Sequence, residues 1–207
     1  MSSWTMRAAT EQDLMAIVDL LNERAAHLAA RGISQWSPGW MTKDRMLPMI
    51  QRGETWVGHD AGQLIVTVSL SAQADPDFWT SEERAIPALY LSKLASRQPG
   101  AGTLAIEWAR QHARRLGYPV LRLDAWATNE ALHAYYRRNG WTHLRTMHVP
   151  GRNSGALFEI PTRRSTMIIQ TNLNVHRPDS SSGIPETRPE VLLEVPWSVV
   201  KGVAPVL

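Results

Sequence analysis

The sequence Ala88-Leu-Tyr-Leu-Ser-Lys-Leu-Ala95, continued by Ser96-Arg-Gln-Pro-Gly-Ala-Gly-Thr103, organises the chain. Its first half is short and apolar, as expected of a buried strand, and its second half carries two glycines just before a helical pattern. Glycines at a strand-to-helix turn let the backbone approach a ligand closely and aim free N–H groups outward. The stretch predicts a strand, a turn suited to phosphate and a helix, although ordinary turn chemistry explains a glycine pair equally well.

A helix, a strand and a second helix follow this turn. The first helix has apolar residues at three- and four-residue spacing, which predicts one buried face made of Leu104, Ala105, Trp108, Ala109 and Leu116. Gly117 suits the left-handed position that ends a helix, and a strand begins just after it. Asn129 caps the second helix, which Gly140 closes. The strands at 88–95 and 120–125 are therefore expected to be neighbours joined by a right-handed helical crossover.

The rest of the chain to about Ile160 alternates further helices and strands. The predicted elements are a strand at 4–9, a helix from a capping box at 10–13 to Gly32, a helix at 43–51, hairpin strands at 55–59 and 63–70, and strands at 144–148 and 156–160. Residues 72–83 between them are polar and irregular. This order predicts an α/β fold with a mixed sheet covered by helices on both faces.

Several motifs resemble the GNAT superfamily of N-acetyltransferases when they are taken in order. They are Arg97-x-x-Gly100-x-Gly102, Leu121-Arg-Leu-Asp124, Asn129, Tyr136 and Gly140-Trp141. The resemblance covers the chain from Thr5 to Ile160. The loop before Arg97 is shorter than in most family members. Either the turn is tight, or Arg97 and Gln98 have roles that differ from those of their family counterparts.

The resemblance implies a largely antiparallel central sheet in which the parallel strands at 88–95 and 120–125 splay apart. Acetyl-coenzyme A, the acyl donor, would lie in the gap, with its pyrophosphate at the glycine turn. The residues expected to bind it are Leu94, Ala95, Ser96, Arg97, Gln98, Gly100, Ala101, Gly102, Thr103, Asn129 and Tyr136.

The reaction implied is direct transfer of an acetyl group to a primary amine. An alkylamine with a pKa of ~10.4 is rarely neutral at pH 7, so the site needs a base or a desolvating pocket. Tyr136, seven residues after Asn129 and four before Gly140, matches the family's tyrosine that assists the departing thiolate, and it is the predicted catalytic residue. Tyr135 is expected to be packing.

Trp36 and Asp124 are the predicted substrate-binding residues. Trp36 lies in the loop that covers the acceptor pocket in the resembled family, although Trp36 and Trp40 would equally well cap the core. Asp124 ends its strand near the expected acyl site, where it is either the base or an anchor for the amine. Other candidate bases are Glu82, Glu83, His148 and Glu159, for each of which a structural role on the surface or on a strand face is the preferred explanation.

Composition predicts one domain, at residues 1–161, with a C-terminal extension at 162–207. The extension is predicted to be mostly disordered, with an edge strand at Met167–Asn172 that pairs in the same subunit or in a homodimer.

The 207 residues include no cysteine, no apolar signal-peptide segment and no apolar segment long enough to span a bilayer, which predicts a cytoplasmic protein without membrane contact. The net charge of +3 without a basic block argues against nucleic acid, and no histidine pair has metal-ligand spacing.

The predicted function is an N-acetyltransferase that acts on the primary amine of a small molecule, with the 32–40 loop and the 72–83 segment enclosing a compact pocket. An acetyltransferase of protein amino-termini or lysines is the alternative, and it requires an open groove. A toxin-like acetyltransferase of aminoacyl-tRNA is a third, disfavoured by the lack of a basic cluster. A coenzyme-A-binding regulatory module without catalysis also remains open.

Overall fold

The computed structural model describes residues 5–33 and 35–163, and the predicted edge strand at Met167–Asn172 lies outside them. Seven strands form one sheet in the order β1-β2-β3-β4-β5-β7-β6. The strands are β1 Met6–Ala8, β2 Thr55–Asp60, β3 Gln63–Ser71, β4 Ala88–Ser96, β5 Val120–Trp126, β6 Thr142–Thr146 and β7 Ser154–Pro161. In this described part of the chain, β4 pairs with β5 in parallel, and every other neighbouring pair is antiparallel.

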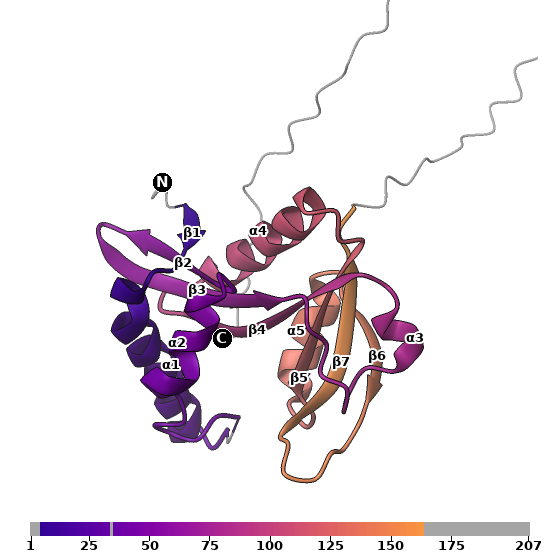
Figure 1. Ribbon diagram of the computed structural model, residues 1–207. Helices are drawn as coiled ribbons and strands as arrows, with labels where there is room; N and C mark the ends of the chain where they lie inside the picture. Colours follow the sequence, from indigo (N-terminus) through magenta and orange to yellow (C-terminus); the bar gives the residue numbers. More distant parts are fainter. Residues whose placement is uncertain (1–4, 34, 164–207) are drawn as a thin grey trace, which may run out of the picture. The chain divides into compact units, whose positions relative to one another are not determined.

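Helices cover both faces of this sheet. They are α1 Leu14–Ala30, α2 Lys43–Gln51, α3 Ser81–Arg84, α4 Ala101–Arg115 and α5 Glu130–Arg138, with a 3-10 turn at Glu11–Asp13 that leads into α1. Figure 1 shows α4 on one side of β3 and β4, and α1 and α2 on the other. Successive strand residues point to opposite faces. Accordingly, Leu94 packs in the cluster with α4 and α5, whereas Ala95 packs in the cluster with α1 and α2.

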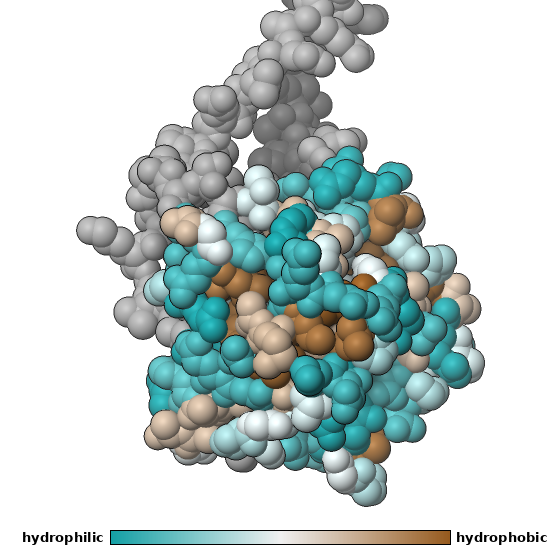
Figure 2. Space-filling model, turned by 60° about the vertical axis from the view of Figure 1, so that its left-hand side comes forward, coloured by the Kyte–Doolittle hydropathy of each residue, from teal (hydrophilic) through white to brown (hydrophobic). Residues whose placement is uncertain are grey.

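Helix α4 shows where the apolar pattern misleads. Leu104 and Leu116, predicted to be buried, are 51% and 57% exposed. The buried face is instead a row of alanines that recurs every four residues, made of Ala101, Ala105, Ala109 and Ala113. Small side chains let the helix lie close to the sheet, so Leu104 and Leu116 fall outside the buried face, although Ile106 is buried. Figure 2 shows one face of the molecule on which hydrophobic surface gathers near the centre among hydrophilic residues.

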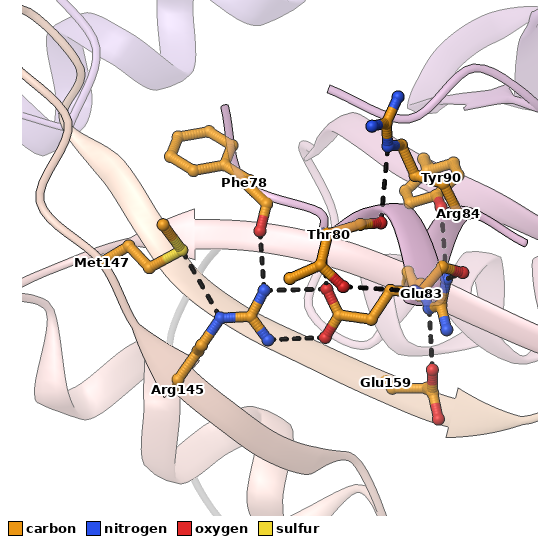
Figure 3. A network of polar contacts seen from close by, with 9 residues as sticks. Phe78, Thr80, Glu83, Arg84, Tyr90, Arg145, Met147 and Glu159 are labelled. Atoms are coloured by element: carbon orange, nitrogen blue, oxygen red, sulfur yellow. Dashed lines mark hydrogen bonds and ion pairs between the residues drawn. The ribbon is translucent and has the colours of Figure 1, made fainter. Parts of the chain in front are cut away.

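Two aromatic residues attach the segment at 72–87 to the sheet. Phe78 and Trp79 are fully buried and form a small cluster with Leu157 of β7. Arg145 of β6 donates to both carboxylate oxygens of Glu83, at 2.5 and 2.8 Å, and to the carbonyl of Phe78 at 2.8 Å (Figure 3). These hydrogen bonds hold the pKa of Glu83 at about 2. The segment is therefore a structural strap over the sheet.

Candidate active site

The parallel strands β4 and β5 separate after their first three residues. Their pairing runs from Ala88 opposite Val120 to Tyr90 opposite Arg122 and then stops. Strand β4 continues to Ser96 while it remains paired with β3, and β5 continues to Trp126 while it remains paired with β7. Each strand therefore presents an edge to a gap inside the sheet, as the predicted splay requires.

The edge of β4 that faces the gap offers backbone hydrogen-bonding groups. Arg97 donates its backbone N–H to Ile65 of β3 at 2.8 Å. Backbone groups along a strand alternate between its two edges, so Ser96 and Leu94 direct theirs away from β3 and toward the gap. A ligand with amide groups can pair with this edge as an added strand does.

Helix α4 begins at the end of this edge with free N–H groups. Gly100 has a φ of +83°, a conformation that favours glycine, and it turns the chain into the helix. Ala101 donates to the Gln98 carbonyl at 3.2 Å, and the first helical bond runs from Leu104 to Gly100. The N–H groups of Gly102 and Thr103 have no acceptor within the helix, because four residues must precede each donor. Together with the helix dipole they fit a phosphate group.

The side chains of Arg97 and Gln98 point to other partners. Arg97 donates to Glu23 of α1 at 2.8 Å and to the Leu64 carbonyl at 2.9 Å. Gln98 donates to Asp60 at 3.2 Å. Both side chains therefore join this turn to α1 and to the β2–β3 hairpin, and phosphate contact by either residue remains a prediction.

A cavity of about 570 Å³ opens beside the gap. It brings together four residues that the sequence predicts for the site: Trp36, Leu94, Asp124 and Tyr136. The wall is made by residues 35–37, 40 and 45, by 91–94 of β4, by 123–126 of β5, by Leu132 and Tyr136 of α5, and by 151–154. The 32–40 loop contributes to this wall as predicted, whereas the strap at 72–87 contributes none of the lining residues.

Tyr136 is held firmly at the cavity wall. Its ring is 6% exposed and lies against Trp141 and Phe158, with ring centroids 5.6 and 5.3 Å apart. Burial raises the pKa of its hydroxyl well above the usual value, so the group stays protonated at neutral pH. Its neighbour Tyr135 instead shares a hydrogen bond of 2.8 Å with Thr103 of α4. The two adjacent tyrosines therefore have different surroundings.

Asp124 lies where β5 borders the cavity. Desolvation by burial raises the pKa of its carboxyl group, while a hydrogen bond with Ser154 and the charge of Arg152 act in the opposite direction. A partly buried carboxyl group with a raised pKa at a cavity wall can anchor an ammonium group or take up a proton. Of the alternative bases, Glu83 is bound to Arg145 and Glu159 to Arg122, and neither they nor Glu82 and His148 line the cavity.

Two stacked indoles also line the cavity. Trp36 and Trp40 lie with ring centroids 5.2 Å apart and an interplanar angle of 28°. Asn22 of α1 fixes the end of this loop, because its side chain exchanges hydrogen bonds of 2.9 and 3.1 Å with the backbone of Met41. Both the predicted roles of Trp36 are compatible with this geometry, since the two rings cover the core of α1 and α2 and also line the cavity.

The remaining predicted residues have structural contacts. Asn129 caps α5, with its side-chain oxygen accepting from Leu132 N–H at 3.0 Å. Ala95 is fully buried beneath α1. Sequence reasoning missed Lys93, Trp126 and Arg152, which line the cavity. Trp126 and Arg152 lie near motif positions, but only the folded structure shows that they line the same cavity as Trp36.

Comparison with known proteins identifies the fold and the family. Residues 14–141 match the model of the Acetyltransferase (GNAT) family. The chain belongs to the GNAT acetyltransferase family. It is also 30% identical over 145 residues to the uncharacterized N-acetyltransferase YesJ of Bacillus subtilis (strain 168), across 66% of this chain and 80% of that protein. The predicted family, fold class and enzyme class, an acyltransferase, are confirmed.

Solved GNAT structures share this architecture at low sequence identity. An acetyltransferase of the family from Listeria monocytogenes 4b F2365 superposes with a TM-score of 0.66 at 21% identity, covering 78% of this chain and 98% of that one. The structure of yncA from Salmonella typhimurium, solved with its cofactor acetyl-CoA, has a TM-score of 0.57 at 18% identity, covering 79% and 96%. Among residues 5–33 and 35–163, no helix has the length and apolar character that crossing a bilayer requires.

Proposed function

We propose that this GNAT protein transfers an acetyl group from acetyl-CoA directly to the primary amine of a small molecule. The observation that carries the proposal is that one cavity at the splayed strands is lined by both a protonated tyrosine and a desolvated carboxyl group. Its volume of about 570 Å³ falls in the range of small-molecule sites, ~300–1,000 Å³.

The residues present fit coenzyme A. The backbone of Leu94 and Ser96 would bind its amide-bearing arm, and the N–H groups of Gly102 and Thr103 its pyrophosphate. Acetyl-CoA, the cofactor of the Salmonella relative, supplies the acetyl group as a thioester. Gly102 is buried at the start of α4, and it has no side chain that could stand between the free N–H groups and an anion.

Two protein groups handle the protons of the reaction. The Tyr136 hydroxyl keeps its proton because it is buried, and it can donate a hydrogen bond or that proton to the sulfur as the thiolate departs. Asp124 would bind the ammonium form of the acceptor and accept a proton from it. The Trp36–Trp40 wall would exclude water from the amine and favour its neutral form.

The test is thiol release from acetyl-CoA, with mass detection of the acetylated product, across amino acids, polyamines, aminoglycosides and peptides. Acetylation of small amines with saturation supports the proposal. Acetylation of peptides alone would favour the protein-directed alternative. Silence with every amine, together with thermal stabilisation by coenzyme A, would favour a regulatory module that binds the cofactor without catalysis. A cytoplasmic location and a homodimer remain predictions of the sequence.

A further inference from the structure

Lys93 has an unusual backbone in the strand that borders the cavity. Among the described residues other than glycine, only Ala61 and Lys93 have positive φ, at 48° and 50°. Ala61 lies in the two-residue turn of the β2–β3 hairpin, where positive φ is required. Lys93 lies inside β4, and its conformation there needs another explanation.

The explanation is a bulge in β4. Thr67 pairs with Ala95 and Ser69 with Ser92, so the two residues Lys93 and Leu94 face the single residue between Thr67 and Ser69. The left-handed first position of such a bulge favours glycine. Bulges next to functional sites redirect a side chain. Here the bulged residue is a lysine that lines the cavity.

The Lys93 ammonium is unpaired in the described part of the chain, where it has no hydrogen bond within 3.5 Å and no ion pair within 4.0 Å. Desolvation lowers its pKa, while Asp124 and Glu54 favour its charged form and Arg52 opposes it. Arg152 on the same wall already binds Asp75 at 2.6 Å and Asp77 at 3.6 Å. Among the described residues that line the cavity, Lys93 and Arg45 are therefore the cations without an ion pair, and Lys93 is the one that burial desolvates.

The other cavity charges fit a ligand of mixed charge. Asp124 is the one carboxylate among the described residues that line the wall. Arg45, at the outer rim, is exposed and donates to the Trp40 carbonyl at 2.9 Å. A ligand with an ammonium group at Asp124 and an anionic group at Lys93 would pair both charges. A polyamine would place additional positive charge near Lys93 and Arg45.

We propose that Lys93 binds an anionic group of the acceptor, so that the preferred acceptors are amines that also carry a carboxylate. This inference rests on the proposed small-molecule acetyltransferase activity, and it selects amino-acid-like amines within that class. Lys93 is then a residue of substrate specificity that acts on the acceptor's far end, whereas Tyr136 and Asp124 act at the reacting atoms.

The experiment compares phenylalanine, β-alanine and γ-aminobutyrate, each with its own amide, and putrescine and spermidine. Amidation also changes the amine pKa, so the quantity compared is kcat/KM of a variant relative to wild type for each acceptor. Lys93→Met should lower this ratio ~10- to 100-fold for the carboxylates, mainly through KM, because a charged hydrogen bond is lost. The amides should change by less than ~3-fold, because an uncharged carboxamide forms no ion pair with Lys93.

Two further variants separate binding from folding. Lys43→Met, at the exposed start of α2, should leave all acceptors unchanged. Lys93→Glu should shift preference from the carboxylates toward the diamines, a gain that misfolding cannot produce. Stabilisation by coenzyme A, measured for every variant, reports whether the cofactor site is intact.

Three outcomes would overturn the inference. One is a wild-type preference for polyamines over the carboxylates, and another is an unchanged preference after Lys93→Glu. The third is an equal loss of kcat for carboxylates and amides in Lys93→Met, which would place the ammonium at the thioester carbonyl instead. If wild type acetylates no amine at all, the proposed function fails, and the inference fails with it.

Discussion

The two ends of the gap between β4 and β5 differ in the groups that a ligand would contact, which are backbone groups at one end and side chains at the other. The proposed cofactor end, at α4, offers backbone groups of one continuous stretch, from Leu94 to Thr103. The proposed acceptor end is the cavity, which is lined by residues far apart in the chain, at 35–37, 40, 45, 91–94, 123–126, 132, 136 and 151–154. A backbone site tolerates most side-chain changes, whereas a side-chain site changes its chemistry with a single substitution. The cofactor end should therefore be robust and the acceptor end sensitive.

The largest effect is expected from Tyr136→Phe. If the hydroxyl protonates the departing thiolate, turnover should fall ~10²-fold or more, whereas the ring still packs on Trp141 and Phe158. Stabilisation by coenzyme A should be retained. The measurement is kcat under conditions where chemistry limits the rate, because slow product release would hide the loss.

Tyr135→Phe is the matched control for this variant. It removes a hydroxyl of the same kind one residue away, and with it the hydrogen bond to Thr103, at a stability cost of ~1 kcal/mol. Its turnover should change little. If the two variants had equal activity, Tyr136 would be a packing residue and the thiolate would leave unaided.

Asp124→Asn should have opposite effects on activity and stability. Loss of the charge should lower kcat/KM ~10- to 100-fold, since a charged partner of the amine is removed. The pKa of Asp124 is raised by burial, so the folded protein favours the neutral acid, and its stability falls as pH rises through the folded-state pKa. The Asp124→Asn variant has no carboxyl group to ionise, so its folded state does not lose stability in this way.

Unfolding of wild type and the Asp124→Asn variant at several pH values measures this second effect. Below the unfolded pKa of ~3.9 the two proteins should differ least, and the advantage of the variant should grow as pH rises above that value. Ser154→Ala, which removes a hydrogen bond to the carboxylate, should raise the pKa of Asp124 further. A variant less stable than wild type at pH 7 would show that the charge of Asp124 is compensated in the fold.

Features formed by one continuous stretch could be predicted from the sequence, whereas features formed by distant segments could not. Gly117, with a φ of +84°, and Asn129, which caps α5, are local signals that depend on a few neighbouring residues, and both predictions are confirmed. The bulge at Lys93 depends on how β4 registers against β3, which a single-chain pattern does not contain. The prediction that Leu104 and Leu116 are buried was wrong. It assumed that the largest apolar side chains of α4 face the sheet, whereas the helix lies close to the sheet through its alanines.

A smaller effect is expected at the cofactor end. Coenzyme A at a hundredfold excess over its dissociation constant should stabilise the wild type by ~2.7 kcal/mol. Gly102→Val should remove this shift, because a branched side chain would stand where the pyrophosphate approaches the free N–H groups. Gly117→Ala, at the other end of α4 with open space around it, is the control. It should lower the melting temperature through its positive φ yet keep the shift.

Either of two results would contradict this assignment. A wild-type melting curve indifferent to millimolar coenzyme A would show that the start of α4 does not hold the cofactor. A Gly102→Val protein with an unchanged shift would show that the pyrophosphate lies elsewhere, for instance beside Arg97 after it releases Glu23.

The smallest effect, close to none, is expected when the chain is truncated after Thr162. Strand β7 ends at Pro161, and Thr162 closes the fold by donating its backbone N–H to the Pro119 carbonyl at 2.9 Å and its hydroxyl to the Tyr118 carbonyl at 2.7 Å. The sheet, the gap and the cavity wall all precede this residue. The truncated protein should therefore melt within ~2 °C of the full chain, a difference of less than ~1 kcal/mol, and keep its stabilisation by coenzyme A.

Truncation before Thr162 should lower the stability more, because it removes these closing hydrogen bonds. Loss of soluble protein on truncation after Thr162, or loss of the cofactor shift, would show that the extension completes one of the two ends, and the comparison between them would then have to include it.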